Sequence, residues 1–427
     1  MPLVFEVSGV FQVIGCNVIT SKEVQVKSLV SSCALGLAFG LTLLPARADE
    51  KAETAWRLFV TDRHLPVMHV LDAAEGKIIK SFDLKSQGRL YPTESGKVVF
   101  AVQADADVAM GFATGIELDD HGDHGDLEVS EPKALGVEIA GKKPVHFVPH
   151  HGDVAIFYDG EGVVRLIKEA DVLEGKSAVR LLETAAPHHG VAIPLGDHVV
   201  VTVPNEQDPS KLPTGVRVLD SSGRQVGEVA ECPGLHGEAS SGHLTAIACE
   251  TGLLIVKETG GKPEIKHLAY AGDLPEDAKV STLLGGKGLQ YFLGNFGQKA
   301  VVLIDPEDEN AFRLIDLPVR RVHFAIDPVR TKFAYVFTED GRLHQINVLS
   351  GKIAKSVGVT EPYSMDGHWN DPRPRIAVAG DEIMVTDPLK GLIHVLDAAT
   401  LEASREFVTG GAPYEIVAVG GSGAVHE

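Results

Sequence analysis

The chain has 427 residues, including 45 glycines and 23 prolines, and its net charge is -20. A domain usually contains about 100–200 residues, so the chain forms several domains or one large closed repeat. Short β-branched runs between evenly spread turn residues exclude a helical bundle, and the negative charge disfavours nucleic-acid binding. Eighteen histidines against four cysteines point to metal binding, because imidazole is the commonest protein ligand for zinc and copper.

The amino terminus has the pattern of a secretory signal. Lys22 and Lys27 precede an apolar run over residues 28–44, which ends in the A-x-A cleavage pattern Ala46-Arg47-Ala48. The run is near the lower length limit for a membrane span, and no stop-transfer charges follow it. We therefore expect residues 1–48 to be removed, leaving residues 49–427 in the periplasm without membrane insertion.

Two cysteines, Cys232 and Cys249, remain after removal of that segment. In an exported chain such a pair predicts a disulfide. It would close a loop of about 17 residues and contribute roughly 3 kcal/mol of stability. The alternative, two free metal-binding thiols, is disfavoured by an oxidising compartment.

A short apolar strand recurs at intervals of roughly 40 to 56 residues, which fits the period of four-stranded propeller blades. The eight copies cover residues 57–62, 97–103, 153–158, 197–203, 243–248, 289–293, 332–337 and 382–386. A second strand that ends in an acidic or polar turn follows most copies, and then a third. Each repeat therefore supplies two central strands and an outer strand, and an inner strand comes before the next copy.

The two ends of the repeat fit a closed ring. The first copy begins with a central strand at Arg57, and residues 413–419 form an inner-strand candidate at the other end. Pairing this last strand into the first blade would remove the exposed sheet edge. The sequence therefore predicts an all-β fold with a single closed β-propeller, with eight four-stranded blades preferred and seven as the alternative.

Histidines stand near the starts of the predicted inner strands in five blades. They are His146, the pair His188 and His189, His236, His323 and His368. Inner strands line the axis of a propeller, so these positions converge on one mouth of its channel. The pattern predicts a metal site, because imidazoles facing a common axis would repel one another once charged unless a cation held them. For any one of them, a structural or solvated histidine is the alternative.

A second candidate cluster lies in an insertion at about residues 117–130. Its core, residues 119–126, alternates histidine and aspartate with glycine, so it cannot bury a core and should form a surface loop. His121, Asp123 and His124 are zinc-capable side chains, and glycine allows the backbone to fold them around one ion. The alternative is a solvated acidic loop.

Motifs of common enzyme chemistry are absent from the sequence. It contains no H-E-x-x-H, G-x-S-x-G or P-loop pattern, so metalloprotease, hydrolase and nucleotide-binding functions lack their reacting groups. We expect no enzymatic activity.

Two resemblances complete the interpretation. Several repeats read strand, Asp, turn, Gly-Lys, strand and Gly-x-Pro, which resembles the YVTN family of bacterial secreted propellers. The Asp-His-Gly-Asp-His-Gly-Asp loop, Pro-Val-His-Phe, Pro-His-His-Gly and Leu-His-Gly-Glu resemble the AztD-type periplasmic zinc metallochaperones. This second resemblance implies tight zinc binding and direct transfer of zinc to the solute-binding protein of a zinc ABC importer.

We expect the two clusters to divide this work in a monomeric protein. His146 and His236 should hold zinc on rigid strands, whereas the loop with His121 and His124 should close over the ion or capture it for transfer. The alternative function is that of a secreted propeller enzyme or adhesion module with structural histidines.

Overall fold

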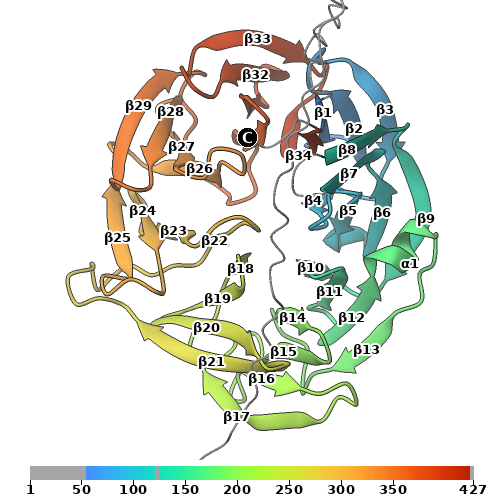
Figure 1. Ribbon diagram of the computed structural model, residues 1–427, viewed down its shortest axis with the longest axis vertical. Helices are drawn as coiled ribbons and strands as arrows, with labels where there is room; N and C mark the ends of the chain where they lie inside the picture. The colour runs from blue at the N-terminus through green and yellow to red at the C-terminus, as the bar shows by residue number, and fades with distance from the viewer. Residues whose placement is uncertain (1–53, 121–124, 424–427) are drawn as a thin grey trace, which may run out of the picture. The chain divides into compact units, whose positions relative to one another are not determined.

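The computed structural model describes residues 54–120 and 125–423. Seven of the eight predicted apolar strands coincide with the second strand of a blade, whereas the copy predicted at residues 289–293 overlaps only the first two residues of its second strand, Phe292–Phe296. The blades are four-stranded antiparallel sheets arranged in a ring (Figure 1). The prediction of an eight-bladed propeller is therefore confirmed, and the seven-bladed alternative is wrong.

Within each blade, the strands follow one another from the ring axis outward. Blades 1 to 4 are β34 (Pro413–Ser422), β1 (Thr54–Asp62), β2 (Val67–Asp72), β3 (Ile78–Asp83); β4 (Arg89–Pro92), β5 (Val98–Gln103), β6 (Val108–Ala113), β9 (Lys133–Ala140); β10 (Pro144–His150), β11 (Asp153–Tyr158), β12 (Val163–Lys168), β13 (Arg180–Glu183); and β14 (Ala192–Leu195), β15 (His198–Val203), β16 (Gly215–Leu219), β17 (Gln225–Glu231). Blades 5 to 8 are β18 (Glu238–Ser241), β19 (Leu244–Cys249), β20 (Gly252–Thr259), β21 (Lys262–Ala269); β22 (Leu283–Leu284), β23 (Phe292–Phe296), β24 (Ala300–Ile304), β25 (Phe312–Asp316); β26 (Arg321–Ile326), β27 (Phe333–Thr338), β28 (Arg342–Asn347), β29 (Lys352–Gly358); and β30 (Ile376–Ala379), β31 (Glu382–Asp387), β32 (Leu392–Asp397), β33 (Ala403–Val408). The described residues also form a short α-helix, α1 (Glu169–Leu173), a 3-10 turn, Ala104–Ala106, and one further hairpin of two strands.

The ring closes through its last strand, as the sequence predicts. β34 pairs antiparallel with β1, and the register runs from Thr54 opposite Ser422 to Asp62 opposite Pro413. The first blade thus takes its inner strand from the carboxyl-terminal part of the chain. This pairing removes an open sheet edge from the ring.

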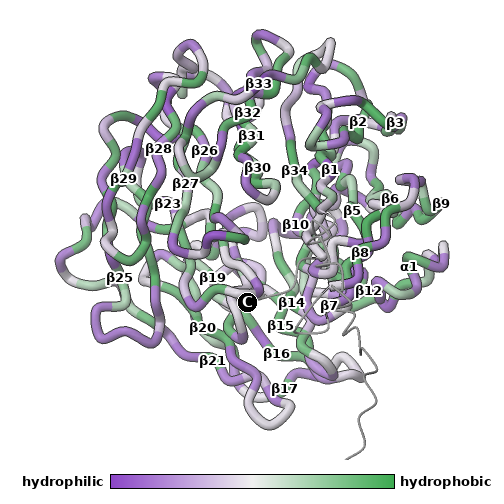
Figure 2. Tube along the Cα trace, turned by 45° about the horizontal axis from the view of Figure 1, so that its top comes forward, coloured by the Kyte–Doolittle hydropathy of each residue, from purple (hydrophilic) through white to green (hydrophobic). Residues whose placement is uncertain are grey.

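Burial explains why the second strands carry the strongest apolar signal. Every residue of β5 and of β19 is buried, because both faces of a central strand pack against the neighbouring blades. Outer strands such as β17 and β29 are largely exposed. Hydrophilic residues accordingly occur in many of the turns at the edge of the ring, next to apolar stretches such as the one near β9 (Figure 2).

The two ends of the ring carry different groups. We call the end at which each inner strand begins the start face, and the other end the opposite face. The hairpin of β7 (Ile116–Asp120) and β8 (Gly125–Val129) is inserted between β6 and β9, so its base lies on the opposite face. There β7 packs against β34, and Lys97 pairs with Glu117 at 3.1 Å.

The predicted disulfide is present. Cys232 and Cys249 are bonded, and both are fully buried. Within the part of the chain that the structure describes, no helix is long and apolar enough to cross a membrane. The predicted signal segment, residues 1–48, lies outside the described residues, so its removal stays a prediction.

Candidate metal centre

Three imidazoles meet near the ring axis at the start face. His146 lies in β10, His189 precedes β14 and His236 precedes β18, so the three come from adjacent blades. Their ring centroids are 4.8 Å apart for His146 and His189, 5.3 Å for His189 and His236, and 6.4 Å for His146 and His236. We call these three residues the triad.

The pairing of the inner strand with the second strand fixes where two members of the triad lie along the ring axis. His146 pairs with Phe157, the fifth residue of β11, immediately after a β-bulge. The backbone N–H of His236 donates to the carbonyl of Ala248, the fifth residue of β19. Glu238 pairs with Ile247 as Phe147 pairs with Ile156, so His236 lies one residue closer to the strand start than the position of His146. A β-bulge re-aims the side chain that follows it, here that of His146.

Each triad imidazole is fixed through its Nδ1 atom by an acceptor. The three contacts are His146 to Oε1 of Glu238 at 3.2 Å, His189 to Oδ2 of Asp159 at 2.7 Å, and His236 to the carbonyl oxygen of Ser281 at 2.8 Å. Carboxylates and carbonyls accept, so Nδ1 carries the proton in each ring and the lone pair belongs to Nε2. This is the arrangement in which acceptors orient histidine ligands of a metal ion.

The Nε2 atoms of His146 and His189 face each other at 3.2 Å. Two lone pairs at that separation repel each other unless a cation lies between them. Burial opposes protonation of His146, but the carboxylate of Glu238 outweighs it and raises the pKa of His146. The pKa of His236 is lowered by burial and, less strongly, by His189 and His146, against the hydrogen bond to Ser281. A bound cation would remove the repulsion between the two lone pairs.

The two carboxylates are incompletely satisfied. Oδ1 of Asp159 and Oε2 of Glu238 are buried and have no hydrogen-bond partner among the described residues. The side chains are only 5% and 12% exposed, respectively. Burying a carboxylate without compensation is costly, and a divalent cation on the triad would balance both negative charges. The donor set therefore fits zinc.

The nitrogen spacing also suits zinc, with one adjustment. Tetrahedral ligands with Zn–N bonds of about 2.0–2.1 Å lie roughly 3.3 Å apart, close to the 3.2 Å between His146 and His189. Imidazole rings on one tetrahedral ion have centroids roughly 5 Å apart, so the 6.4 Å between His146 and His236 must shorten by about 1 Å. Accordingly, no ligand group over residues 54–120 and 125–423 already has the closed arrangement of a bound metal.

The other predicted ligands are not in this group. Both ring nitrogens of His188 are engaged, with the Ala186 carbonyl at 2.8 Å and the Thr202 hydroxyl at 2.9 Å. His323 lies in blade 7, where its Nδ1 accepts a hydrogen bond from the backbone N–H of Ile376 at 3.1 Å.

His368 lies in an exposed loop between β29 and β30. His121, Asp123 and His124 lie outside the described residues, although the strands that flank them, β7 and β8, stand on the opposite face.

Sequence reasoning missed the residues that orient the triad. Glu238 belongs to the quoted Leu-His-Gly-Glu motif, so its position two residues after His236 could have drawn attention to it. Asp159 follows β11 in an ordinary-looking acidic turn, and only its burial sets it apart. The disulfide adds a further constraint, because Cys232 leads into the turn before His236 and Cys249 follows Ala248.

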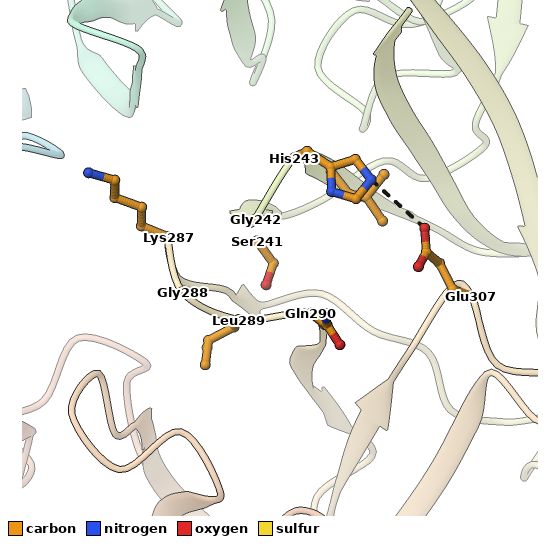
Figure 3. A pocket seen from close by; sticks show the side chains of 9 residues that line it. Ser241, Gly242, His243, Lys287, Gly288, Leu289, Gln290 and Glu307 are labelled. Carbon is orange, nitrogen blue, oxygen red and sulfur yellow. Dashed lines mark ion pairs between the residues drawn. The ribbon is translucent and has the colours of Figure 1, made fainter. Parts of the chain in front are cut away.

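A pocket elsewhere in the molecule does not compete with the triad. It has a volume of about 280 Å³ and is lined by the turn between β18 and β19 and by residues 287–290 and 307 (Figure 3). This turn lies on the opposite face. The ion pair there, His243 with Glu307 at 3.8 Å, is more than half exposed on both sides, so it lacks the buried charge that the triad provides.

Comparison with known proteins bears on both the fold and the site. No protein-family model matches the chain. The chain is 51% identical over 405 residues to the zinc chaperone AztD of Citrobacter koseri, an alignment that covers 95% of this chain and 96% of that protein.

Solved structures give the same result. The crystal structure of Citrobacter koseri AztD matches with a TM-score of 0.85 and 52% identity, covering 88% of this chain and all of that one. The apo AztD structure from the same species matches with a TM-score of 0.83 and 50% identity over 87% of this chain and 100% of that one. The dihydro-heme d1 dehydrogenase NirN, at 14% identity and a TM-score of 0.57 over 88% of this chain and 78% of that one, shares the fold alone.

Proposed function

The chain belongs to the AztD family of zinc chaperones, and on this basis we propose that it binds zinc at the triad and delivers it to the solute-binding protein of a zinc ABC importer. We place this activity in the periplasm, after removal of residues 1–48, and assign it to a monomer. The relative is a zinc chaperone, a role without a catalysed reaction, so the prediction that the chain is not an enzyme is confirmed. Zinc is cargo here and not a resident cofactor.

The observation that carries the proposal is the pair of buried, half-satisfied carboxylates behind the triad. Asp159 and Glu238 hold two negative charges and orient two of the three imidazoles. A hydrogen-bonded structural histidine does not need such a charge behind it. A zinc ion does, because ligand basicity and ring orientation both depend on these outer partners.

The same geometry suits release as well as binding. Three nitrogen ligands leave the fourth tetrahedral position to water or to an incoming ligand. The side chain of His189 is 32% exposed, so the group is open on one side. A ligand from an acceptor protein could take the fourth position first, and the imidazoles could then leave one at a time.

We propose that His121, Asp123 and His124 form a separate zinc-capturing group. The strands that carry them end at Asp120 and Gly125 on the opposite face. The triad lies at the start face, so this placement favours capture at a separate site over closure above the triad. On this proposal, changing His121 and His124 to alanine together slows transfer and leaves the triad ion in place.

Equilibrium dialysis against zinc, followed by metal analysis, tests the binding step. We expect one or two retained ions per chain and the loss of one ion in a variant with His146→Ala and His236→Ala. Mixing zinc-loaded protein with apo solute-binding protein, then separating the two and measuring metal in each, tests the delivery step. An unchanged stoichiometry in the double variant would contradict the assignment of the triad.

A further inference from the structure

The long loop between β29 and β30 has a preorganised shape. Arg373 is 7% exposed, and its guanidinium donates to the carbonyl oxygens of Ser364, His368 and Asp366 at 2.9, 3.0 and 3.0 Å. One buried side chain thus gathers three backbone carbonyls of the same loop. A loop held in this way loses little conformational freedom when a partner binds it.

This loop reaches across the start face toward the triad. Arg63, which follows β1 in blade 1, donates to the carbonyl of Asn370 at 3.2 Å, and the hydroxyl of Tyr414 donates to the Asn370 side chain at 3.3 Å. The guanidinium of Arg89, at the start of blade 2, stacks over the ring of Trp369 at 5.5 Å. The loop therefore extends from blades 7 and 8 to blade 2, which adjoins the blade of His146.

Trp369 stands out in solvent at the tip of this loop. It is 68% exposed, although large aromatic side chains are usually well buried. Tryptophan and arginine are the residues most enriched among those that dominate binding energy at protein interfaces. An exposed tryptophan on a fixed loop is a ready contact for another protein.

The charges beside Trp369 are uncompensated. Among the described residues, neither Arg63 nor Arg89 forms an ion pair, although the chain as a whole carries a net charge of -20. The position of Arg89 also ties this surface to the triad, because Arg89 begins β4, the inner strand of the blade next to that of His146. A partner that brings carboxylates here would pair these two cations.

We propose that Trp369, Arg63 and Arg89 form the docking surface for the zinc-accepting protein, which presents an apolar pocket bordered by carboxylates. This inference rests on the proposed function and names the side of the molecule at which delivery takes place. Docking on the start face holds the acceptor over the open side of the triad. Steering by opposite charge would also raise the rate of encounter and make it depend on salt.

The test is the rate of zinc transfer from the zinc-loaded full chain to the apo solute-binding protein. Trp369→Ala should slow transfer by about tenfold or more at limiting acceptor concentration, with zinc stoichiometry and affinity unchanged. Leu349→Ala is the matched control, because Leu349 is 74% exposed and follows β28 on the opposite face. Raising the ionic strength should slow the wild type, and less so an Arg63→Ala variant.

Each outcome decides something different. Normal transfer by the Trp369→Ala variant would overturn the docking surface and leave zinc delivery intact. Weaker zinc binding in that variant, with its melting temperature unchanged, would assign the loop to the zinc site and also overturn the docking role. Absence of transfer from the wild type would refute the proposed function and this inference together.

Discussion

His146 and His323 occupy the same position in two blades and have opposite surroundings. Each follows a β-bulge in the inner strand and pairs with the fifth residue of the second strand, Phe157 or Phe337. His146 faces a carboxylate, and its Nε2 is directed at another imidazole. His323 faces arginines and uses its Nδ1 to accept a backbone N–H.

The surroundings act on protonation in opposite directions. Burial lowers the pKa of both residues, but Glu238 reverses the effect at His146. At His323, the charges of Arg375 and Arg321 reinforce burial and hold the pKa well below its usual value. The fold therefore supplies a repeated histidine position, and the charged residues around that position decide whether the histidine can act as a ligand.

The largest expected effect comes from removing the central imidazole. His189→Ala should weaken zinc binding at the triad by more than about a hundredfold, because even outer partners of metal ligands are worth 10–100-fold. Competition against a chelator of known affinity measures the change.

His323→Asn serves as the contrasting variant. The side-chain oxygen of the introduced asparagine can still accept the N–H of Ile376, so we expect the fold to be retained and the zinc affinity to be unchanged. Equal losses in the His189→Ala and His323→Asn variants would erase the distinction between the two blades.

A smaller effect is expected from the carboxylates that orient the triad. Glu238→Gln and Asp159→Asn keep the size of each side chain and remove its charge, so zinc affinity should fall by about 10–100-fold. Titration with zinc, compared with the melting temperature of the metal-free protein, separates lost affinity from lost stability. Unchanged affinity in both variants would argue that these acids are structural.

The pH dependence should follow the raised pKa of His146. Zinc binds neutral imidazole, so affinity is complete above that pKa and decreases as pH falls through it. The decrease should begin at a higher pH than for an ordinary histidine, whose pKa is about 6.5. Glu238→Gln should move the onset to lower pH, since the charge that raises the pKa is gone; an onset that stays in place would contradict the role of Glu238.

The smallest effect on zinc should come from the disulfide. Cys232→Ala with Cys249→Ala should lower the free energy of unfolding by about 3 kcal/mol and weaken zinc binding only a few-fold, through looser placement of His236. Denaturant unfolding and zinc titration of the same variant measure both quantities. A loss of affinity as large as that of His189→Ala would show that the bridge, and not strand register, positions the third ligand.

Most of the fold could be predicted from the sequence because its signal is periodic. Buried second strands such as β5 and β19 are uniformly apolar, and closure follows from a leftover inner strand at residues 413–419. The choice among the histidines depends on contacts between blades. His188 and His189 are neighbours in sequence, yet one bonds to Ala186 and Thr202 while the other joins the triad.

The order of the blades along the chain shows which histidines are neighbours around the ring. His146, His189 and His236 come from three consecutive blades, so they are neighbours around the ring, whereas His323 stands two blades beyond. Sequence spacing is sufficient to show this. The roles of Asp159 and Glu238 are not accessible in the same way, because an acidic turn residue looks alike whether it is solvated or buried.

Ring closure by β34 has a consequence for biogenesis. The partner of Thr54 is Ser422, so the first blade cannot assemble until almost the whole chain is available. Contacts this distant in sequence form slowly, and an unfilled blade leaves a bare strand edge that can recruit other chains. Tyr414, whose hydroxyl bonds to Asn370 in the loop of Trp369, also belongs to this strand. A chain that lacks this strand would therefore lack the assembled contact surface. Zinc delivery through that surface requires that the ring has closed.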